Sequence, residues 1–291
     1  MPDINMINGH TQLTALLGSP VSHSLSPAMH NMAFRILGIN CVYLCFDVTE
    51  DALPAAVEGL RRCGILGFNL TMPDKNRMVS LADELSPAAR ITGAVNTVVN
   101  RNGKLTGHCT DGTGFLRSAA ENGWECKGES MTILGAGGAA SAIAVQAALD
   151  GTRTLTIAAR PESRFHDRTS ELIRTLREET GCQASLIDIS DQQSLRAAIR
   201  ESTLLVNATP VGMEPDTGQS LITDPAFFHR HLTVSDIIYS PRKTRLLELA
   251  EAAGCPTFNG MHMLLWQGAE AFRLWTGRDM PVEAVRERFF S

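Results

Sequence analysis

A glycine-rich run, GAGGAA at 135–140, constrains the fold of this chain more than any other stretch of its sequence. The apolar segment MTIL precedes it and an alanine-rich segment follows it. This order matches G-x-G-x-x-G/A between a strand and a helix, where glycines let the backbone turn tightly and approach a pyrophosphate. The phosphate charge then lies on the unpaired N–H groups of the helix N-terminus. The run therefore predicts dinucleotide binding by its backbone, at Gly135, Ala136, Gly137, Gly138 and Ala139.

Short apolar runs and helix-like periods alternate along the chain on both sides of this loop. The apolar runs are 13–18, 41–48, 65–73, 131–134, 154–160, 184–189, 202–209 and 232–239. Alternation of this kind favours parallel sheets covered by helices, because parallel strands need crossover connections. We therefore predict an α/β fold with two domains, one mainly parallel and one a Rossmann-type doubly wound domain. A length of 291 residues agrees with two domains.

The domain boundary is expected near residue 110. The segment 107–130 contains a glycine-flanked turn followed by a helical pattern, which suits a bridge between domains. We assign 1–110 to a substrate-binding catalytic domain and 111–259 to the dinucleotide-binding domain. The amphipathic helix that ends at Gly277 belongs to a C-terminal segment, 260–291, which we expect to complete the first domain.

Composition excludes several other classes of protein. The chain has 26 basic and 31 acidic residues without a Lys/Arg run, so nucleic-acid binding is not expected. It has no apolar run of about 20 residues and no secretory pattern at its start, so we expect a cytoplasmic protein without a membrane partner. Seven cysteines without C-x-x-C and histidines without H-E-x-x-H predict neither disulfides nor a metal site.

The end of the second strand of the dinucleotide-binding series bears on the cofactor. An acidic residue there usually pairs with the ribose hydroxyls of NAD, whereas an arginine suits the 2′-phosphate of NADP. This chain has Ala159 and Arg160 at that point, followed by Glu162 and Arg164. The two arginines favour NADP and Glu162 favours NAD, so the predicted cofactor is NAD or NADP. Alternatively, Glu162 and Arg164 are solvent-exposed charges of a turn that contact no cofactor.

Polar residues follow the buried strand at 65–70, at the sheet edge where open α/β sheets bind ligands. They are Asn69, Thr71 and Lys75, and Asn96 and Asp111 come later in the chain. Taken singly, each is an ordinary surface or turn residue.

Two serines, Ser24 and Ser26, stand one residue apart before Pro27 and a helical pattern. Two hydroxyl donors at this spacing suit the two oxygens of one carboxylate. Ser26 also suits the N-cap position of the helix, with proline at the next position.

Together the motifs S-x-S-P, N-x-T-x-P-x-K, G-A-V-N-T, T-D-G-x-G, G-A-G-G-A, N-A-T and M-L-x-x-Q resemble those of the shikimate dehydrogenase family, in order and over nearly the whole chain. The amino-acid sequence at 83–100 and 264–277 is most similar to the quinate/shikimate dehydrogenase branch. Cys109, Ala159 and Asn259 depart from the pattern, because the family has asparagine at the first two positions and commonly aspartate at the third.

The resemblance implies an enzyme of the chorismate pathway to aromatic amino acids that oxidises shikimate to 3-dehydroshikimate with NAD or NADP. It implies Lys75 and Asp111 as the catalytic pair that handles the proton, and Thr209 and Gly260 as further cofactor contacts. The substrate contacts that it implies are Ser24, Ser26, Asn69, Thr71, Asn96, Tyr239 and Gln267.

Three alternatives remain open at this stage. The first is an enzyme that turns over quinate as well as shikimate, or that prefers quinate, whose saturated ring carries an extra hydroxyl. A chain of the same fold can also serve as a non-catalytic nicotinamide-binding regulator, although binding alone does not need the pair Lys75 and Asp111. A methylene-tetrahydrofolate dehydrogenase shares the lysine and the Rossmann domain, but lacks the two serines. We expect a monomer or a homodimer.

Overall fold

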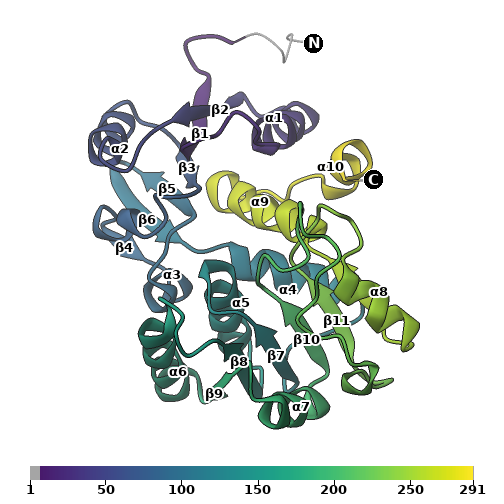
Figure 1. Ribbon diagram of the computed structural model, residues 1–291. Helices are drawn as coiled ribbons and strands as arrows, with labels where there is room; N and C mark the ends of the chain where they lie inside the picture. Colours follow the sequence, from purple (N-terminus) through teal and green to yellow (C-terminus); the bar gives the residue numbers. More distant parts are fainter. Residues whose placement is uncertain (1–6, 291) are drawn as a thin grey trace. The chain divides into compact units, whose positions relative to one another are not determined.

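The computed structural model describes residues 7–290, and within them the chain forms two six-stranded sheets (Figure 1). The predicted α/β class with a Rossmann-type half is confirmed. Unit 1 comprises Met1–Thr110 and Gln267–Ser291, and unit 2 comprises Asp111–Trp266. The functions assigned to 1–110 with 260–291 and to 111–259 stay predictions.

The sheet of unit 1 has the strand order β2-β1-β3-β5-β6-β4. Strand β1 runs parallel to β2 and β3, whereas β5 is antiparallel to both β3 and β6. The strands are β1 (Gln12–Gly18), β2 (Cys41–Asp47), β3 (Gly67–Leu70), β4 (Glu84–Leu85), β5 (Thr97–Arg101) and β6 (Lys104–His108). The helical elements are α1 (Ser26–Leu37), α2 (Leu53–Arg62), η1 (Arg77–Ser80), α3 (Pro87–Thr92), α10 (Val282–Phe289) and the end of α9 (Met261–Thr276).

The hairpin of β5 and β6 was not among the predicted elements. Its two-residue turn consists of Asn102 and Gly103, which have φ angles of 55° and 85°. A type I′ turn needs positive φ at both central residues, and Asn-Gly is the pair that adopts it most readily. The dipeptide between two apolar runs was therefore the signal that predicts this hairpin.

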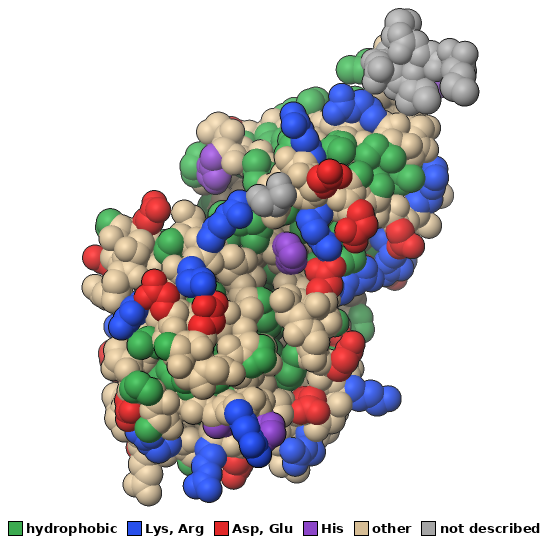
Figure 2. All heavy atoms as spheres, turned by 90° about the vertical axis from the view of Figure 1, so that its right-hand side faces the viewer, with side chains coloured by type: hydrophobic (Ala, Val, Ile, Leu, Met, Phe, Trp, Pro, Cys, Tyr) green, Lys and Arg blue, Asp and Glu red, His purple; other side chains and the backbone are tan. Residues whose placement is uncertain are grey.

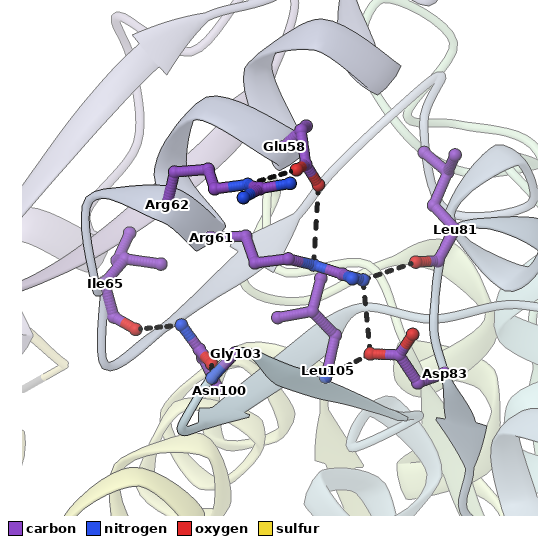
Figure 3. A network of polar contacts seen from close by, with 9 residues as sticks. All are labelled: Glu58, Arg61, Arg62, Ile65, Leu81, Asp83, Asn100, Gly103 and Leu105. Atoms are coloured by element: carbon purple, nitrogen blue, oxygen red, sulfur yellow. Dashed lines mark hydrogen bonds and ion pairs between the residues drawn. The ribbon is translucent and has the colours of Figure 1, made fainter.

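A set of polar contacts attaches the hairpin to the rest of unit 1 (Figure 3). Arg61 at the end of α2 forms an ion pair with Asp83 at 3.2 Å, and the same carboxylate accepts the backbone N–H of Leu105 at 2.7 Å. On the hairpin, the Asn100 amide donates to the carbonyl of Ile65 at 2.9 Å. These contacts fix the hairpin near its turn. The other end of the hairpin lies at the carboxyl edge of the sheet.

A cluster of aromatic side chains fills the core between α1, β2 and the C-terminal half of α9. The ring of His30 stacks on Tyr43 with centroids 4.5 Å apart, and it also contacts Phe272 and Trp275 at 6.2 and 5.2 Å. Neither ring nitrogen of His30 has a hydrogen-bond partner among the described residues. Burial lowers the pKa of His30 to about 3, so the folded protein holds a neutral imidazole.

His30 is therefore expected to make the protein less stable in acid. A histidine in the unfolded chain has a pKa near 6.5, so between this value and about 3 only the unfolded state binds the proton. The free energy of unfolding then falls as pH falls, by at most about 1.4 kcal/mol per pH unit from this residue. His30→Leu should flatten this dependence in urea unfolding at about pH 7, 6 and 5, whereas removal of the exposed His10 should not. An unchanged slope in His30→Leu would contradict the assignment.

Unit 2 is a parallel sheet with the strand order β12-β11-β10-β7-β8-β9. Its strands are β7 (Ser130–Leu134), β8 (Thr154–Ala159), β9 (Gln183–Asp188), β10 (Leu204–Asn207), β11 (Thr233–Asp236) and β12 (Thr257–Asn259). Its helical elements are α4 (Asp111–Glu121), α5 (Gly138–Leu149), α6 (His166–Thr180), α7 (Gln192–Glu201), η2 (Pro225–Phe227), α8 (Arg245–Ala252) and the start of α9. The order reverses at β7, which is the point where sheets of this kind bind a dinucleotide.

Candidate functional site

The carboxyl edge of the unit 1 sheet gathers most of the predicted substrate residues. Strands β1 and β3 end there, and the antiparallel β5 begins there, since Asn69 of β3 pairs with Thr97 of β5. Strand β6 also ends at this edge, two residues before Thr110. The residues at this edge or in the segments that leave it are Ser24, Ser26, Asn69, Thr71, Lys75, Asn96 and Asp111. Gln267 lies partly buried in α9.

The two serines differ from the expected arrangement. Helix α1 begins at Ser26, and the preceding Leu25, which takes the N-cap position, makes no capping hydrogen bond with its side chain. The alternative role of Ser26 as an N-cap is therefore wrong. Instead the Ser24 hydroxyl accepts the backbone N–H of Ser26 at 3.2 Å.

A chain of buried polar groups connects the ends of the strands at this edge. The Tyr43 hydroxyl donates to Oδ1 of Asn69 at 2.8 Å. Nδ2 of Asn69 donates to the carbonyl of Asn96 at 3.1 Å and to Oγ1 of Thr97 at 2.9 Å. Oδ1 of Asn96 in turn accepts the backbone N–H of Thr110 at 2.8 Å. The carboxamides of both asparagines thus fix the backbone that leads into Asp111.

Sequence reasoning missed three members of this chain. Thr97 and Thr110 lie inside the motifs G-A-V-N-T and T-D-G-x-G, where only the neighbouring Asn96 and Asp111 were selected. Tyr43 carries no local signal, because a tyrosine in an apolar strand is an ordinary core residue.

The backbone around Lys75 is attached to the same edge. The N–H of Thr71 donates to Leu17 at 3.0 Å, and the carbonyl of Lys75 accepts the N–H of Val95 at 2.8 Å. The adjacent Asp74 is fully buried, and neither of its carboxylate oxygens has a hydrogen-bond partner among the described residues. Burial, with a smaller contribution from Glu50, raises the pKa of Asp74. Lys75 itself is partly buried.

Asp111 is the first residue of α4, which packs tightly on α5. A methyl group on the next residue, Gly112, would collide with the carbonyl of Ala142. The partly buried Asp111 is therefore held by a helix whose position is fixed on one side by α5 and whose entry is fixed by Thr110.

The glycine run lies between β7 and α5, as predicted. Gly135 has φ 108°, and its N–H donates to Ala158 at 2.8 Å. A Cβ there would lie 2.8 Å from Cγ2 of Thr209, so a side chain has no room. Helix α5 starts at Gly138 without a side-chain cap. The strand, the bare turn and the uncapped helix start suit a pyrophosphate, so these residues fit a dinucleotide.

The charges after β8 lie in solvent. Nε of Arg160 and Oε1 of Glu162 are 4.0 Å apart, with side chains 75% and 73% exposed. The Arg164 guanidinium lies over the ring of Phe165, 4.7 Å from its centroid. An exposed pair at this distance stabilises little, so Arg160 is available to a ligand.

A second buried network holds the loops after β10 and β11. Oδ1 of Asn207 accepts from the hydroxyl of Thr209 at 2.7 Å, and its Nδ2 donates to Asp236 at 3.0 Å. The Asp236 carboxylate also accepts the Thr244 hydroxyl at 2.8 Å. Burial raises the pKa of Asp236 despite these contacts. The network sets the position of Thr209 and of the segment that carries Tyr239, and sequence reasoning missed Asp236 and Thr244.

The remaining predicted positions, Tyr239 and Gly260, lie after β11 and directly before α9. Tyr239 is 51% exposed. A methyl group on Gly260 would collide with the carbonyl of Ile237. Asn259, one of the departures from the family pattern, donates to the carbonyl of Arg242 at 2.8 Å and accepts the N–H of Met261 at 3.1 Å at the start of α9.

Residues 7–290 contain no group of three or more His, Cys, Asp or Glu that could hold a metal ion. No helix in the part of the chain that the structure describes is both long and apolar enough to cross a membrane. On the face drawn in Figure 2, basic and acidic side chains are interspersed.

Comparisons with known proteins identify relatives over nearly the whole length. Residues 16–98 match the family model of the shikimate dehydrogenase substrate binding domain, and residues 260–288 match that of the shikimate 5'-dehydrogenase C-terminal domain. A shikimate dehydrogenase (NADP(+)) from Listeria monocytogenes is 48% identical over 284 residues, which are 98% of this chain and 97% of the relative.

Solved structures show the same relationship. The shikimate 5-dehydrogenase from Listeria monocytogenes, crystallised with shikimate and NAD, has a TM-score of 0.95 and 48% identity, and 98% of each chain is covered. A quinate dehydrogenase from Corynebacterium glutamicum in complex with NAD has a TM-score of 0.83 and 32% identity, over 96% of this chain and 98% of that one.

Proposed function

This chain belongs to the shikimate dehydrogenase family, and we propose that it interconverts shikimate and 3-dehydroshikimate with NADP as the preferred cofactor. The observation that carries the proposal is the gathering of hydroxyl, carboxamide and ammonium side chains at one edge of the unit 1 sheet. We assign the catalytic carboxylate to Asp111, which follows β6 in the chain. The relatives that are 48% identical carry this activity in their names.

In this proposal Ser24 and Ser26 bind the substrate carboxylate. Each hydroxyl gives one hydrogen bond to one oxygen, and hydrogen bonds to a charged acceptor are the strong ones. Thr71, Asn96 and Gln267 contact the ring and its hydroxyls, and Asn69 contributes only its Oδ1, because both amide hydrogens are used inside the protein.

Lys75 gives a proton to, or takes one from, the oxygen on the reacting carbon, and Asp111 orients that hydroxyl and the ammonium. Positioned proton transfer of this kind contributes about 10² to 10⁴ in rate. When bound, the nicotinamide supplies the hydride chemistry. The backbone of 135–139 with Thr209 and Gly260 holds the dinucleotide, and Tyr239 lies beside the substrate and nicotinamide.

Arg160 is expected to set the preference for NADP, because its exposed guanidinium suits the 2′-phosphate. Arg160→Ala should raise the KM for NADP roughly tenfold and leave the KM for NAD within about twofold. Steady-state rates with each cofactor measure this, and Arg200→Ala, an exposed arginine at the end of α7, serves as the control. Equal changes of KM for both cofactors would mean that Arg160 attracts either cofactor by its charge and does not recognise the 2′-phosphate.

Initial rates in a grid of shikimate or quinate against NAD or NADP test the function itself. We expect the highest kcat/KM with shikimate and NADP. A preference for quinate would favour the second candidate, which the similarity to a quinate dehydrogenase supports. Cofactor binding without turnover in any of the four combinations of substrate and cofactor would favour a non-catalytic regulator and contradict the proposal.

A further inference from the structure

Gly18 is the last residue of β1, and it lies against Thr71, to which the proposed function gives a contact with the substrate ring. Strands β1 and β3 are parallel neighbours (Figure 1), and their register runs up to the residues just before Gly18 and Thr71. The N–H of Thr71 donates to the carbonyl of Leu17 at 3.0 Å, and the N–H of Ser19 donates to the carbonyl of Met72 at 3.2 Å. Backbone hydrogen bonds therefore hold Gly18 and Thr71 side by side at the carboxyl edge of the sheet.

Gly18 has no room for a side chain. It is buried, and its φ of 150° is a conformation that is nearly restricted to glycine. A Cβ on this backbone would overlap the Cγ2 methyl of Thr71 and would lie 3.0 Å from the carbonyl oxygen of Met72. The carbonyl of Gly18 accepts the N–H of Val48 at 3.0 Å, which fixes the backbone from the side of β2. The space that a side chain at position 18 would occupy is thus filled by the methyl group of Thr71.

The position of this methyl group also sets the direction of the Thr71 hydroxyl. Both groups are carried by the same Cβ, so when the methyl lies against Gly18 the hydroxyl must take another staggered position. Thr71 is partly buried, and its hydroxyl makes no hydrogen bond with any residue in the described range 7–290. The carboxamide of Asn69 in β3, by contrast, is bound inside the protein by Tyr43 and Asn96. The Thr71 hydroxyl is therefore left for a ligand.

We propose that Gly18 is a positioning residue for substrate recognition, because it receives the Thr71 methyl group and so makes Thr71 present its hydroxyl to the substrate. This inference rests on the proposed function, which gives Thr71 its contact with the substrate ring. A side chain at position 18 would force Thr71 to rotate about χ1, and the hydroxyl would leave its place. A ring hydroxyl of the substrate would then lose its hydrogen-bond partner.

A double-mutant cycle between Gly18→Ala and Thr71→Ser tests the inference. In the wild-type background the new methyl group meets that of Thr71, so Gly18→Ala should lower kcat/KM for shikimate roughly tenfold. Serine keeps the hydroxyl but has no methyl group, so in the Thr71→Ser background the same change should lower kcat/KM by less than about threefold. Backbone strain and the contact with Met72 act in both backgrounds. Equal factors would therefore show a merely structural role for Gly18 and overturn the inference.

Gly38→Ala is the matched control for backbone strain. Gly38 follows α1 with a φ of 65°, and a Cβ there would meet no neighbouring atom within 4 Å. An alanine at this position is strained but displaces nothing, so Gly38→Ala should lower the free energy of unfolding and leave kcat/KM within about twofold of the wild type. Urea unfolding of each variant establishes that the protein is folded under the conditions of the kinetic assay.

A second measurement leaves Gly18 unchanged, and so does not depend on the folding of Gly18→Ala. Thr71→Ser keeps the hydroxyl but removes the methyl group that Gly18 receives, so the hydroxyl spreads over several staggered positions. The KM for shikimate should therefore rise roughly two- to threefold, with little change in kcat. Thr71→Val keeps the methyl group and removes the hydroxyl, and it should raise the KM roughly tenfold.

The outcomes separate the inference from the proposed function. A wild-type KM in Thr71→Ser would overturn the inference and leave the proposed function intact. Wild-type kinetics in Thr71→Val would remove Thr71 from substrate recognition and would overturn the inference as well. A wild-type protein that does not turn over shikimate with either cofactor would overturn both the inference and the proposed function.

Discussion

Lys75→Ala is expected to lower kcat for shikimate oxidation by roughly 10³-fold, while the KM for shikimate changes by less than about tenfold. The reason is that the proposed role of Lys75 is a proton transfer in the transition state, whereas we assign the contacts that hold the substrate carboxylate to Ser24 and Ser26. Steady-state kinetics with saturating NADP measure both constants.

Lys104→Ala is the matched control for this prediction. Lys104 is an exposed lysine of the same unit, paired with Glu84 at 2.6 Å at the start of β6. Its removal should leave kcat within about twofold, because an exposed ion pair contributes little. Near-normal turnover in Lys75→Ala would exclude Lys75 from the chemistry.

Trp275→Ala is expected to lower the free energy of unfolding by about 3 to 5 kcal/mol. Trp275 is only 2% exposed, its ring contacts His30, and its Nε1 donates to the carbonyl of Val98 at 2.9 Å. Truncation leaves a large cavity and removes a hydrogen bond to the buried strand β5. Urea unfolding followed by circular dichroism measures the change.

Leu274→Ala serves as the comparison for the tryptophan, because the neighbouring Leu274 is only partly buried. Leu274→Ala should lower the free energy of unfolding by less than half as much as Trp275→Ala. Similar losses for the two variants would mean that the C-terminal half of α9 is not attached to unit 1 through the aromatic cluster.

The dinucleotide-binding half of the fold was the more predictable half. Its strands are buried apolar runs separated by helical periods, and the GAGGAA loop fixes the order of strand, turn and helix. The mixed sheet of unit 1 was predicted less fully, because the only sequence signal for its hairpin is the dipeptide Asn102-Gly103. Alternation of short runs does not distinguish a hairpin from two crossover strands.

The site was predictable as a set of residue types, but not as a set of contacts. Motif order selected Ser24, Asn69 and Asn96, and the structure places them at one sheet edge. The hydrogen bonds that orient the two asparagines come from Tyr43 and Thr110, which are far apart in the sequence. Such partners depend on the register between strands, and no local pattern encodes it.

The central claim is that this chain moves a hydride between shikimate and a nicotinamide. Shikimate labelled with deuterium at the carbon that becomes the ketone tests it most directly, with the reduced cofactor recovered and weighed by mass spectrometry. We expect NADPH that carries one deuterium, formed in step with 3-dehydroshikimate. NADPH without the label, or no reduction of NADP or NAD in the presence of shikimate, would contradict the account.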